Sequence, residues 1–374
     1  SVSYEKFQKL KDEIIILIFI SHYKGINDHI ASSRLWSIIM REYLTKIFHH
    51  YLSLENINYR KNFFILSLGK LGVSDLNYSS DIDLIIFFKS NENIKFQDFN
   101  KIVKNILSKI SNVSISFFHK IDMRLRPDFG ADSVISDLDS SVEYYSSIGR
   151  NWERLAFHRS SFLCGNYSLF LNFKFLIHNF LYRKSFDFYA IDEIKKLFIF
   201  SKSTKSSINI KSSLGYIRTC ENILHFFQLI WSGKIQDLRN ISIHKLFDKL
   251  FNYPYIISKV DLLTIKNAYY YFRWIEDILH IKYNSKINTV SFKDLGVLNL
   301  NENVESELTN YSQKVISIYN KLFKPEDTET TYDIINFNIN SSSISNNWYQ
   351  RSNEKINSNQ IKKDFDNIIN AFLS

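Results

Sequence analysis

The sequence predicts an α+β protein in which a small α/β unit, preceded by helices, is followed by an all-helical bundle domain. Two short apolar runs, 63–68 and 84–88, have the length of buried strands and are separated by a glycine-containing turn. After Gly165 the pattern changes, because apolar residues from 167 to 323 recur at spacings of three and four and strand signals nearly vanish. At 374 residues the chain is long enough for two or three domains with a sizeable core.

The elements of the first part follow from the spacing of its apolar residues. Residues 4–55 have helical periodicity, and 96–110 have the pattern of an amphipathic helix between the second and third strands. The third strand is expected at 113–126, where side chains alternate between two faces. One face carries Ile121, Met123 and Leu125, and the other carries Asp122, Arg124 and Arg126.

Changes in composition suggest three regions. We expect N-terminal helices and a catalytic α/β domain at 1–165, a helical bundle domain at 166–323, and a polar, partly disordered tail at 324–374. An amphipathic helix at 359–372 would close the tail.

Composition also limits the partners and the compartment. The net charge of +9 is compatible with a polyanionic partner, but no basic stripe stands out, so we expect lysines on a solvated surface and no nucleic acid. Cys164 and Cys220 lie in apolar surroundings without metal-ligand spacing, which is typical of the reducing cytoplasm. The apolar run at 14–20 is too short to cross a bilayer and lacks a cleavage pattern, so no membrane partner is expected.

Two aspartates at the start of the second strand are the main candidates for chemistry. Asp81 and Asp83 stand one residue apart, so a strand would point both carboxylates to one face, where they repel unless a cation lies between them. Oxygen ligands of this kind suit Mg²⁺, or Mn²⁺. Asp122 on the neighbouring strand would complete a two-metal site.

Cationic and glycine residues around these carboxylates indicate phosphate chemistry. Arg124 and Arg126 would grip phosphate oxygens, and the turn Gly69-Lys70-Leu71-Gly72, which is not a Walker loop, would let backbone amides approach a phosphate. An Asp-x-Asp pair alone is typical of a turn or strand cap, and an Arg-x-Arg pair alone is typical of a solvated face. The ordered combination instead favours nucleotidyl transfer on the plan of polymerase-β-like nucleotidyltransferases.

Several segments resemble one family, that of the glutamine synthetase adenylyltransferase/adenylyl-removing enzyme. The most specific are LGKLGVSDLNYSSDIDLII at 68–86 and IDMRLRP at 121–127. YYSSIGRNWERLAFHR at 144–159 resembles the segment that closes the family's catalytic domain, and KSSLGYIRTCENILHFFQ at 211–228 resembles a family helix. The resemblance extends from about residue 4 to about 320.

The family enzyme has two catalytic halves, and the resemblance implies one of them here. One half attaches AMP from ATP to a tyrosine of glutamine synthetase, and the other removes it by phosphorolysis and releases ADP. Residues 77–80 and 149–154 resemble the removing half more closely, and the chain has room for only one half. The transferase direction, and a non-catalytic module that binds nucleotide or protein through a decayed site, stay open as alternatives.

The resemblance implies roles for individual residues. Asp81, Asp83 and Asp122 would bind the metals and act in catalysis, while Gly69, Lys70, Ser80, Arg124, Arg126 and Arg218 would contact the phosphates of the nucleotide, ATP or ADP. Arg218 and Glu221 would close over the site or form a surface ion pair. Glutamine synthetase would be the protein substrate, and the PII signal protein a regulatory partner.

The helical part departs from the family pattern at several positions. A family glycine is Tyr216 here and a family aspartate is Thr219, while the family's Lys-Ala-Arg reads 159–161 as Arg-Ser-Ser. The Gly-Pro after the Arg-Pro segment reads Asp-Ser at 132–133, and Gln-Thr-His reads Lys-Ile-Asn at 286–288. The aromatic residues Phe226, Phe227, Tyr269, Tyr270 and Phe272 are expected in the bundle core rather than around an adenine.

Overall fold

The fold is known from a computed structural model. It describes residues 13, 17–18, 29–54, 61–77, 80–92, 94–113, 120–127, 133–186, 188–198, 200–201, 207–283, 288–291 and 304–323. Contacts divide the chain into two units. The first comprises Ser1–Arg183, Ser232–Lys245 and Arg273–Asn288, and the second comprises Lys184–Trp231, Leu246–Phe272 and Thr289–Ser374.

The first unit is built on a small mixed sheet. Its strands are β1 (Phe63–Ser67), β2 (Ile82–Phe88), β3 (Ile121–Asp122), β4 (Ser136–Asp137) and β5 (Ser161–Gly165). β1 pairs antiparallel with β2 and with β5, giving the order β3-β2-β1-β5. β3 and β4 each pair parallel with β2, β3 at its start and β4 at its end. The start of β2, where β3 pairs with it, therefore brings the candidate site residues of the two strands together.

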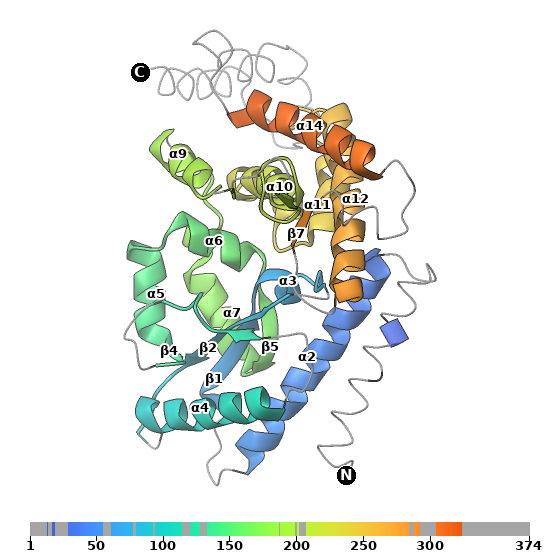
Figure 1. The fold of residues 1–374 in the computed structure, drawn as a ribbon. Helices are drawn as coiled ribbons and strands as arrows, with labels where there is room; N and C mark the ends of the chain where they lie inside the picture. The colour runs from blue at the N-terminus through green and yellow to red at the C-terminus, as the bar shows by residue number, and fades with distance from the viewer. Residues whose placement is uncertain are drawn as a thin grey trace, which may run out of the picture. The chain divides into compact units, whose positions relative to one another are not determined.

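Helices cover both faces of this sheet (Figure 1). On one face α2 (His29–Ser53) and α4 (Phe96–Val113) pack through a cluster that includes Trp36, Phe48 and Phe99. On the other face lie α5 (Leu138–Ser147), α6 (Asn151–His158), α7 (Tyr167–Leu176) and α8 (His178–Leu181), with Tyr145 and Phe173 in their shared cluster. β1 and β2 are therefore buried on both sides, which is why they appear in the sequence as uninterrupted apolar runs.

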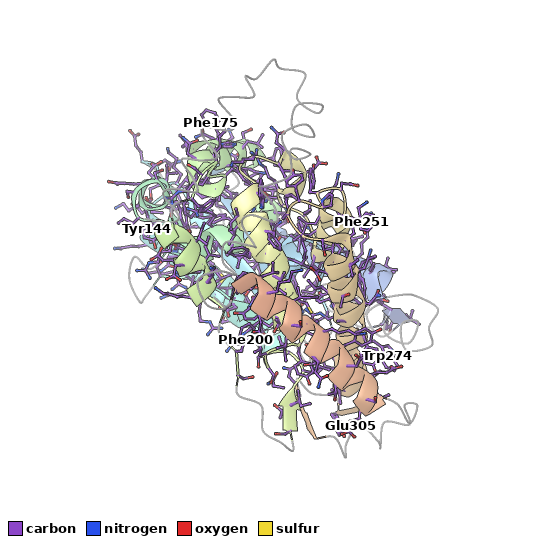
Figure 2. All side chains as sticks on the ribbon, turned by 90° about the horizontal axis from the view of Figure 1, so that it is seen from above. Tyr144, Phe175, Phe200, Phe251, Trp274 and Glu305 are labelled. Carbon is purple, nitrogen blue, oxygen red and sulfur yellow. The ribbon has the colours of Figure 1, made fainter. Side chains whose placement is uncertain are left out.

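Local sequence signals set several helix boundaries in this unit. Asp137 accepts a hydrogen bond from the amide of Ser140 and begins α5, and Asn166 accepts one from Leu169 and begins α7. In α6, Glu153 accepts a hydrogen bond from the amide of Arg150 and one from the hydroxyl of Tyr144, which is labelled in Figure 2. Glu153 is therefore a capping residue in the described structure.

The expected order of strand, short helix, strand, helix and strand is confirmed. The structure has β1, α3 (Gly69–Gly72), β2, α4 and β3 in that order. The third strand is shorter than the expected 113–126, because β3 ends at Asp122 and the chain turns at Arg124 and Leu125. Residues 114–119 lie outside the described residues.

The second unit is mainly helical. It contains α9 (Phe188–Lys196), α10 (Ile217–Trp231), α14 (Val304–Phe323), most of α11 (Ile243–Leu250) and the first part of α12 (Lys259–Tyr283). Ring contacts join these helices, with Phe226 4.9 Å from Phe323 and Tyr216 5.2 Å from Phe272 between centroids. Phe200, labelled in Figure 2, has its ring 5.3 Å from that of Tyr319. Aromatic side chains therefore form much of the packing, as expected.

A short β ribbon in the second unit departs from the all-helical expectation. β6 (Ser207–Asn209) pairs antiparallel with β7 (Thr289–Ser291). Three-residue strands have too few positions for an alternating pattern, so the sequence did not indicate them.

The three regions expected from composition stay a prediction, and the polar tail at 324–374 with its closing helix lies outside the described residues. Both cysteines, Cys164 and Cys220, are buried. Among the helices of the described ranges, none combines the length and apolar character needed to cross a membrane.

Candidate functional site

Two candidate carboxylates are brought together by strand pairing. β2 and β3 run parallel with Ile82 opposite Ile121 and Asp83 opposite Asp122. The amide of Ile82 donates to the carbonyl oxygen of Lys120 at 2.9 Å, which fixes this register. Asp81 lies one residue before β2 and is exposed, whereas Asp83 is half-buried. The two aspartates of the Asp-x-Asp pair therefore occupy different environments.

The Gly-Lys-Leu-Gly turn lies directly against Asp83. The amide of Leu68 donates to the carbonyl oxygen of Asp83 at 2.9 Å, and α3 begins at the next residue. Gly69 has φ +56°, and a Cβ atom built there would lie 2.2 Å from Oδ2 of Asp83. A side chain at position 69 would therefore be strained in its backbone and would collide with the carboxylate.

Charge accumulates at Asp83. Burial, together with the neighbouring charges of Asp122 and Asp81, raises the pKa of Asp83 to about 6, while the charges of Arg159 and Arg124 oppose the rise. Two of the causes are thus like charges on the other candidate ligands. A cation in this place would relieve that repulsion.

Asp122 is held by its own arginine. The side chain of Arg124 donates to both carboxylate oxygens, with Nε 3.0 Å from Oδ1 and Nη2 2.5 Å from Oδ2. These hydrogen bonds hold the pKa of Asp122 below its usual value. Because the chain turns after β3, the expectation that Arg124 and Arg126 share a strand face with Asp122 is wrong.

Arg126 points to a different part of the unit. Its Nη1 donates to the carbonyl oxygen of Met123 at 2.7 Å. The side chain also lines a cavity of about 330 Å³ together with Phe96, Pro127, Ser133, Ile135, Asp137 and Ser140. A phosphate role for Arg126 stays a prediction.

The other residues predicted to contact nucleotide phosphates, Lys70, Ser80 and Arg218, lie in three different parts of the chain. The carbonyl oxygen of Lys70 accepts from the amide of Asp75 at 2.8 Å, and the charge of Lys70 acts on Asp75. The hydroxyl of Ser80 hydrogen-bonds the side chain and the amide of Asn77. Arg218 is exposed and belongs to the second unit. Tyr78 and Ser79 lie outside the described residues.

The donor set fits a hard divalent cation in its chemistry. Asp81, Asp83 and Asp122 supply only carboxylate oxygens, and their mutual repulsion raises the pKa of Asp83. Within the described ranges, however, no group of three or more His, Cys, Asp or Glu side chains is arranged as a ready metal site. Since Arg124 occupies both oxygens of Asp122, a metal that uses Asp122 would have to replace these hydrogen bonds.

Sequence reasoning missed several polar residues around this site. Arg159 directly follows α6, and its charge opposes the rise in pKa that burial causes at both Asp83 and Asp75. Asn77 and Glu276 form a buried hydrogen bond of 2.9 Å although 199 positions separate them. No local pattern connects them, but the placement of Glu276 on the buried side of an aromatic-rich helix was a usable signal.

A small mixed sheet with carboxylates on neighbouring strands beside a glycine turn is consistent with a nucleotidyltransferase-like fold. Residues 26–175 match the family model described as glutamate-ammonia ligase adenylyltransferase. The match confirms the family resemblance of the motifs at 68–86, 121–127 and 144–159, which all lie within these residues.

Curated relatives agree with the family model. The chain is similar to proteins named bifunctional glutamine synthetase adenylyltransferase/adenylyl-removing enzyme. The match from Mannheimia haemolytica is 28% identical over 316 residues, covering 73% of this chain and 32% of the relative. That from Psychromonas ingrahamii is 30% identical over 266 residues, covering 67% and 28%. That from Shewanella woodyi is 31% identical over 234 residues, covering 58% and 24%. The chain thus spans at most about a third of these relatives.

Proposed function

We propose that the chain is a metal-dependent, polymerase-β-like nucleotidyltransferase with a helical bundle as its second domain, and that it acts on glutamine synthetase. The direction that we favour is phosphorolytic removal of AMP from an adenylylated tyrosine, which releases ADP and serves the regulation of nitrogen assimilation. The observation that carries the proposal is the pairing of Asp83 with Asp122 beside the Gly69 turn, within the segment that matches the family.

In this reaction an oxygen of inorganic phosphate attacks the phosphorus of the AMP group. The bond from that phosphorus to the tyrosine oxygen breaks, the tyrosine takes up a proton, and ADP forms. Asp81, Asp83 and Asp122 would hold Mg²⁺ or Mn²⁺, which neutralises charge on the transferring phosphoryl group when bound. Arg124 would exchange Asp122 for a phosphate oxygen, since its fork of donors suits either partner.

The glycine turn and the other predicted contacts complete the proposal. Gly69 leaves room beside Asp83, and Lys70, Ser80, Arg126 and Arg218 are proposed to contact nucleotide phosphates. A cytoplasmic location accords with the two buried cysteines, Cys164 and Cys220. Regulation by the PII signal protein is part of the proposal through the family resemblance alone.

The test compares substrates as well as variants. Purified chain is incubated with adenylylated glutamine synthetase plus phosphate, or with unmodified glutamine synthetase plus ATP, and ADP and modified tyrosine are measured. We expect phosphate-dependent ADP release that is lost in the double variant Asp81→Asn/Asp83→Asn. Asp139→Asn serves as the matched control, because Asp139 is an exposed carboxylate paired with Lys89 at 3.0 Å.

Other outcomes separate the alternatives. Turnover with ATP alone would assign the transferase direction to the same site. Two substituted family positions favour the non-catalytic alternative, because Tyr216 and Thr219 are buried in local packing, where Thr219 Oγ1 accepts from the amide of Gly215 at 2.8 Å. Absence of turnover in both directions, with nucleotide binding that does not respond to Mg²⁺, would support that alternative.

A further inference from the structure

A buried ion pair on α12, between Arg273 and Glu276, contacts Asn77 in the segment before β2. Nη1 of Arg273 is 2.5 Å from Oε2 of Glu276, one helical turn later. The two side chains are 1% and 0% exposed. Burying such a pair removes two charges from water, and apolar residues of similar volume are often at least as stable. A role in positioning is therefore a better explanation for this pair than stability.

Glu276 also binds the segment before β2. The same oxygen, Oε2, accepts a hydrogen bond from Nδ2 of Asn77 at 2.9 Å. Asn77 is itself buried, so its side-chain amide has few alternative hydrogen-bond partners. If the amide were reversed, its oxygen would face the carboxylate of Glu276. Glu276 thereby sets which end of the Asn77 side chain faces which neighbour.

The other end of Asn77 is hydrogen-bonded to Ser80, the residue before Asp81. Its side-chain Oδ1 accepts a hydrogen bond from the hydroxyl of Ser80, and its backbone N–H donates to Oγ of Ser80 at 3.1 Å. The amide of Ser80 donates back to the carbonyl oxygen of Asn77 at 3.1 Å. Asp81 follows directly, and Asp83 is the second residue of β2. A connected chain of hydrogen bonds thus runs from Arg273 to the residue before Asp81.

Neighbouring contacts hold this arrangement in place on both sides. The amide of Leu76 donates to Oγ of the fully buried Ser37 at 3.0 Å. Next to Glu276, Oδ2 of Asp277 lies 2.8 Å from Nδ1 of His29 at the start of α2. The helix turn that carries Glu276 is therefore anchored independently of Asn77.

We infer that Glu276 is a positioning residue: through Asn77 it holds Ser80 in place, so that Asp81 and Asp83 present their carboxylates together. This inference rests on the proposed function for its catalytic consequence, but its structural content does not. It requires the hydrogen-bond acceptor on Glu276 rather than its charge. Charge and acceptor can be separated, because glutamine keeps an oxygen that accepts from Asn77 and loses the ion pair with Arg273.

The experiment uses four variants of the chain: Glu276→Ala, Glu276→Gln, Asn77→Ala and Asn151→Ala. Asn151→Ala is the matched control, because Oδ1 of Asn151 accepts from Nη1 of the buried Arg154 at 2.7 Å, so this variant also removes a hydrogen bond between an asparagine side chain and a buried charged residue. Three quantities are measured: the thermal midpoint, the hydrogen-exchange rate of the Ser80 amide, and the dissociation constant for Mn²⁺.

Glu276→Ala and Asn77→Ala should speed exchange at Ser80 at least tenfold and weaken Mn²⁺ binding by a similar factor. Glu276→Gln should lower the thermal midpoint, since it breaks the ion pair, yet keep exchange and Mn²⁺ affinity within about threefold of the parent chain. Asn151→Ala should lower the midpoint alone. If Glu276→Gln raised the exchange rate at Ser80 as much as Glu276→Ala does, or if Asn77→Ala left that rate unchanged, the inference would be overturned.

The same data distinguish failure of the inference from failure of the proposed function. A parent chain that binds no Mn²⁺, combined with the expected exchange pattern, would keep the positioning role and contradict metal-dependent transfer. A parent chain that binds Mn²⁺ and turns over, combined with unchanged values in Asn77→Ala, would do the reverse. Should Glu276→Ala fail to fold, Asn77→Ala tests the same hydrogen bond from its other end without removing the ion pair.

Discussion

A Cβ atom on Gly69 would lie 2.2 Å from Oδ2 of Asp83, so the glycine turn and the carboxylate share one small space. Backbone strain adds to the collision, because Gly69 has φ +56°, a conformation that costs a non-glycine residue about 1–2 kcal/mol. Position 69 thus controls where the Asp83 carboxylate can lie.

We predict that Gly69→Ala lowers Mn²⁺ affinity by tenfold or more while lowering stability by only about 1–2 kcal/mol. The collision involves the end of a side chain, so Asp83 can move aside, but it then leaves its place opposite Asp122. Calorimetric titration with Mn²⁺ and chemical denaturation measure the two effects.

Gly215→Ala is the control for that measurement. Gly215 also has a positive φ, of +92°, and its added Cβ would lie 2.5 Å from Oγ of Ser312 in the second unit. It should reduce stability and leave Mn²⁺ affinity unchanged. Equal loss of affinity in both variants would contradict a specific role of Gly69.

A second prediction concerns the stability cost of the carboxylate group. Asp83→Asn should raise the free energy of unfolding at pH 8 by about 1–3 kcal/mol, because it removes a partly buried charge that Asp122 and Asp81 repel. We also expect Asp83→Asn to lose Mn²⁺ binding. This loss would show that the carboxylate, which lowers stability, is needed for function.

Asp122→Asn provides the opposite case. The pKa of Asp122 is lowered by hydrogen bonds from Arg124, so ionisation of Asp122 favours the folded state and the substitution should not stabilise it. Denaturation curves for both variants at pH 8 measure the difference. Stabilisation by Asp122→Asn would contradict the favourable effect assigned to ionised Asp122. Destabilisation by Asp83→Asn would contradict the unfavourable effect assigned to ionised Asp83.

The strands and the carboxylates were predictable because their signals are local. β1 and β2 are buried on both faces, so they appear as apolar runs, and Asp83 and Asp122 follow from strand order alone. The placement of Arg126 was not predictable, since an alternating pattern continues through 126 while the chain turns after Asp122. Leu125 shows the consequence, because it packs on the opposite face of the sheet from Ile121 and Met123.

The polar support of the site was hidden for a different reason. Asn77 and Glu276 meet only through tertiary folding, and a single glutamate in a helix normally indicates an exposed position. Arg159 likewise acts on Asp83 through space, from the residue that follows α6. Partners of this kind require coordinates, because neither periodicity nor spacing relates them.

A third prediction tests the exchange of partners proposed for Arg124. The side chain is 87% exposed, so Arg124→Gln should lower stability at pH 8 only slightly, by the amount that corresponds to the rise in the pKa of Asp122. Loss of its hydrogen bonds should raise the pKa of Asp122, measured by carbon-13 NMR titration of the carboxyl group. In the phosphorolysis assay, KM for phosphate should rise several-fold.

Lys89→Gln is the matched control for Arg124, because it removes an exposed cation that pairs with Asp139 at 3.0 Å. It should change neither the pKa of Asp122 nor KM. An Arg124→Gln variant with unchanged KM would assign Arg124 to Asp122 alone and exclude the proposed exchange.

The last prediction concerns Asp75, which follows the glycine turn and is 7% exposed. Burial raises its pKa to about 6, although the amide of Ile243 donates to Oδ2 at 2.9 Å. The folded state therefore holds a proton on Asp75 more tightly than the unfolded state, where the pKa is near its usual value. The resulting penalty is absent below about pH 4, grows as pH rises, and is complete above about pH 6.

Asp75→Asn should remove this pH dependence, because the amide oxygen can still accept from Ile243 and no charge is buried. The difference in unfolding free energy between the parent chain and the variant should shift in favour of the variant by up to about 3 kcal/mol between pH 4 and pH 7. Oδ1 of Asp75 lies 3.5 Å from Nε2 of His244, and a positive charge on this histidine would reduce the shift. Denaturant titrations at half-unit pH intervals measure it, and a difference that did not change with pH would show that Asp75 ionises as readily in the folded chain as in the unfolded one.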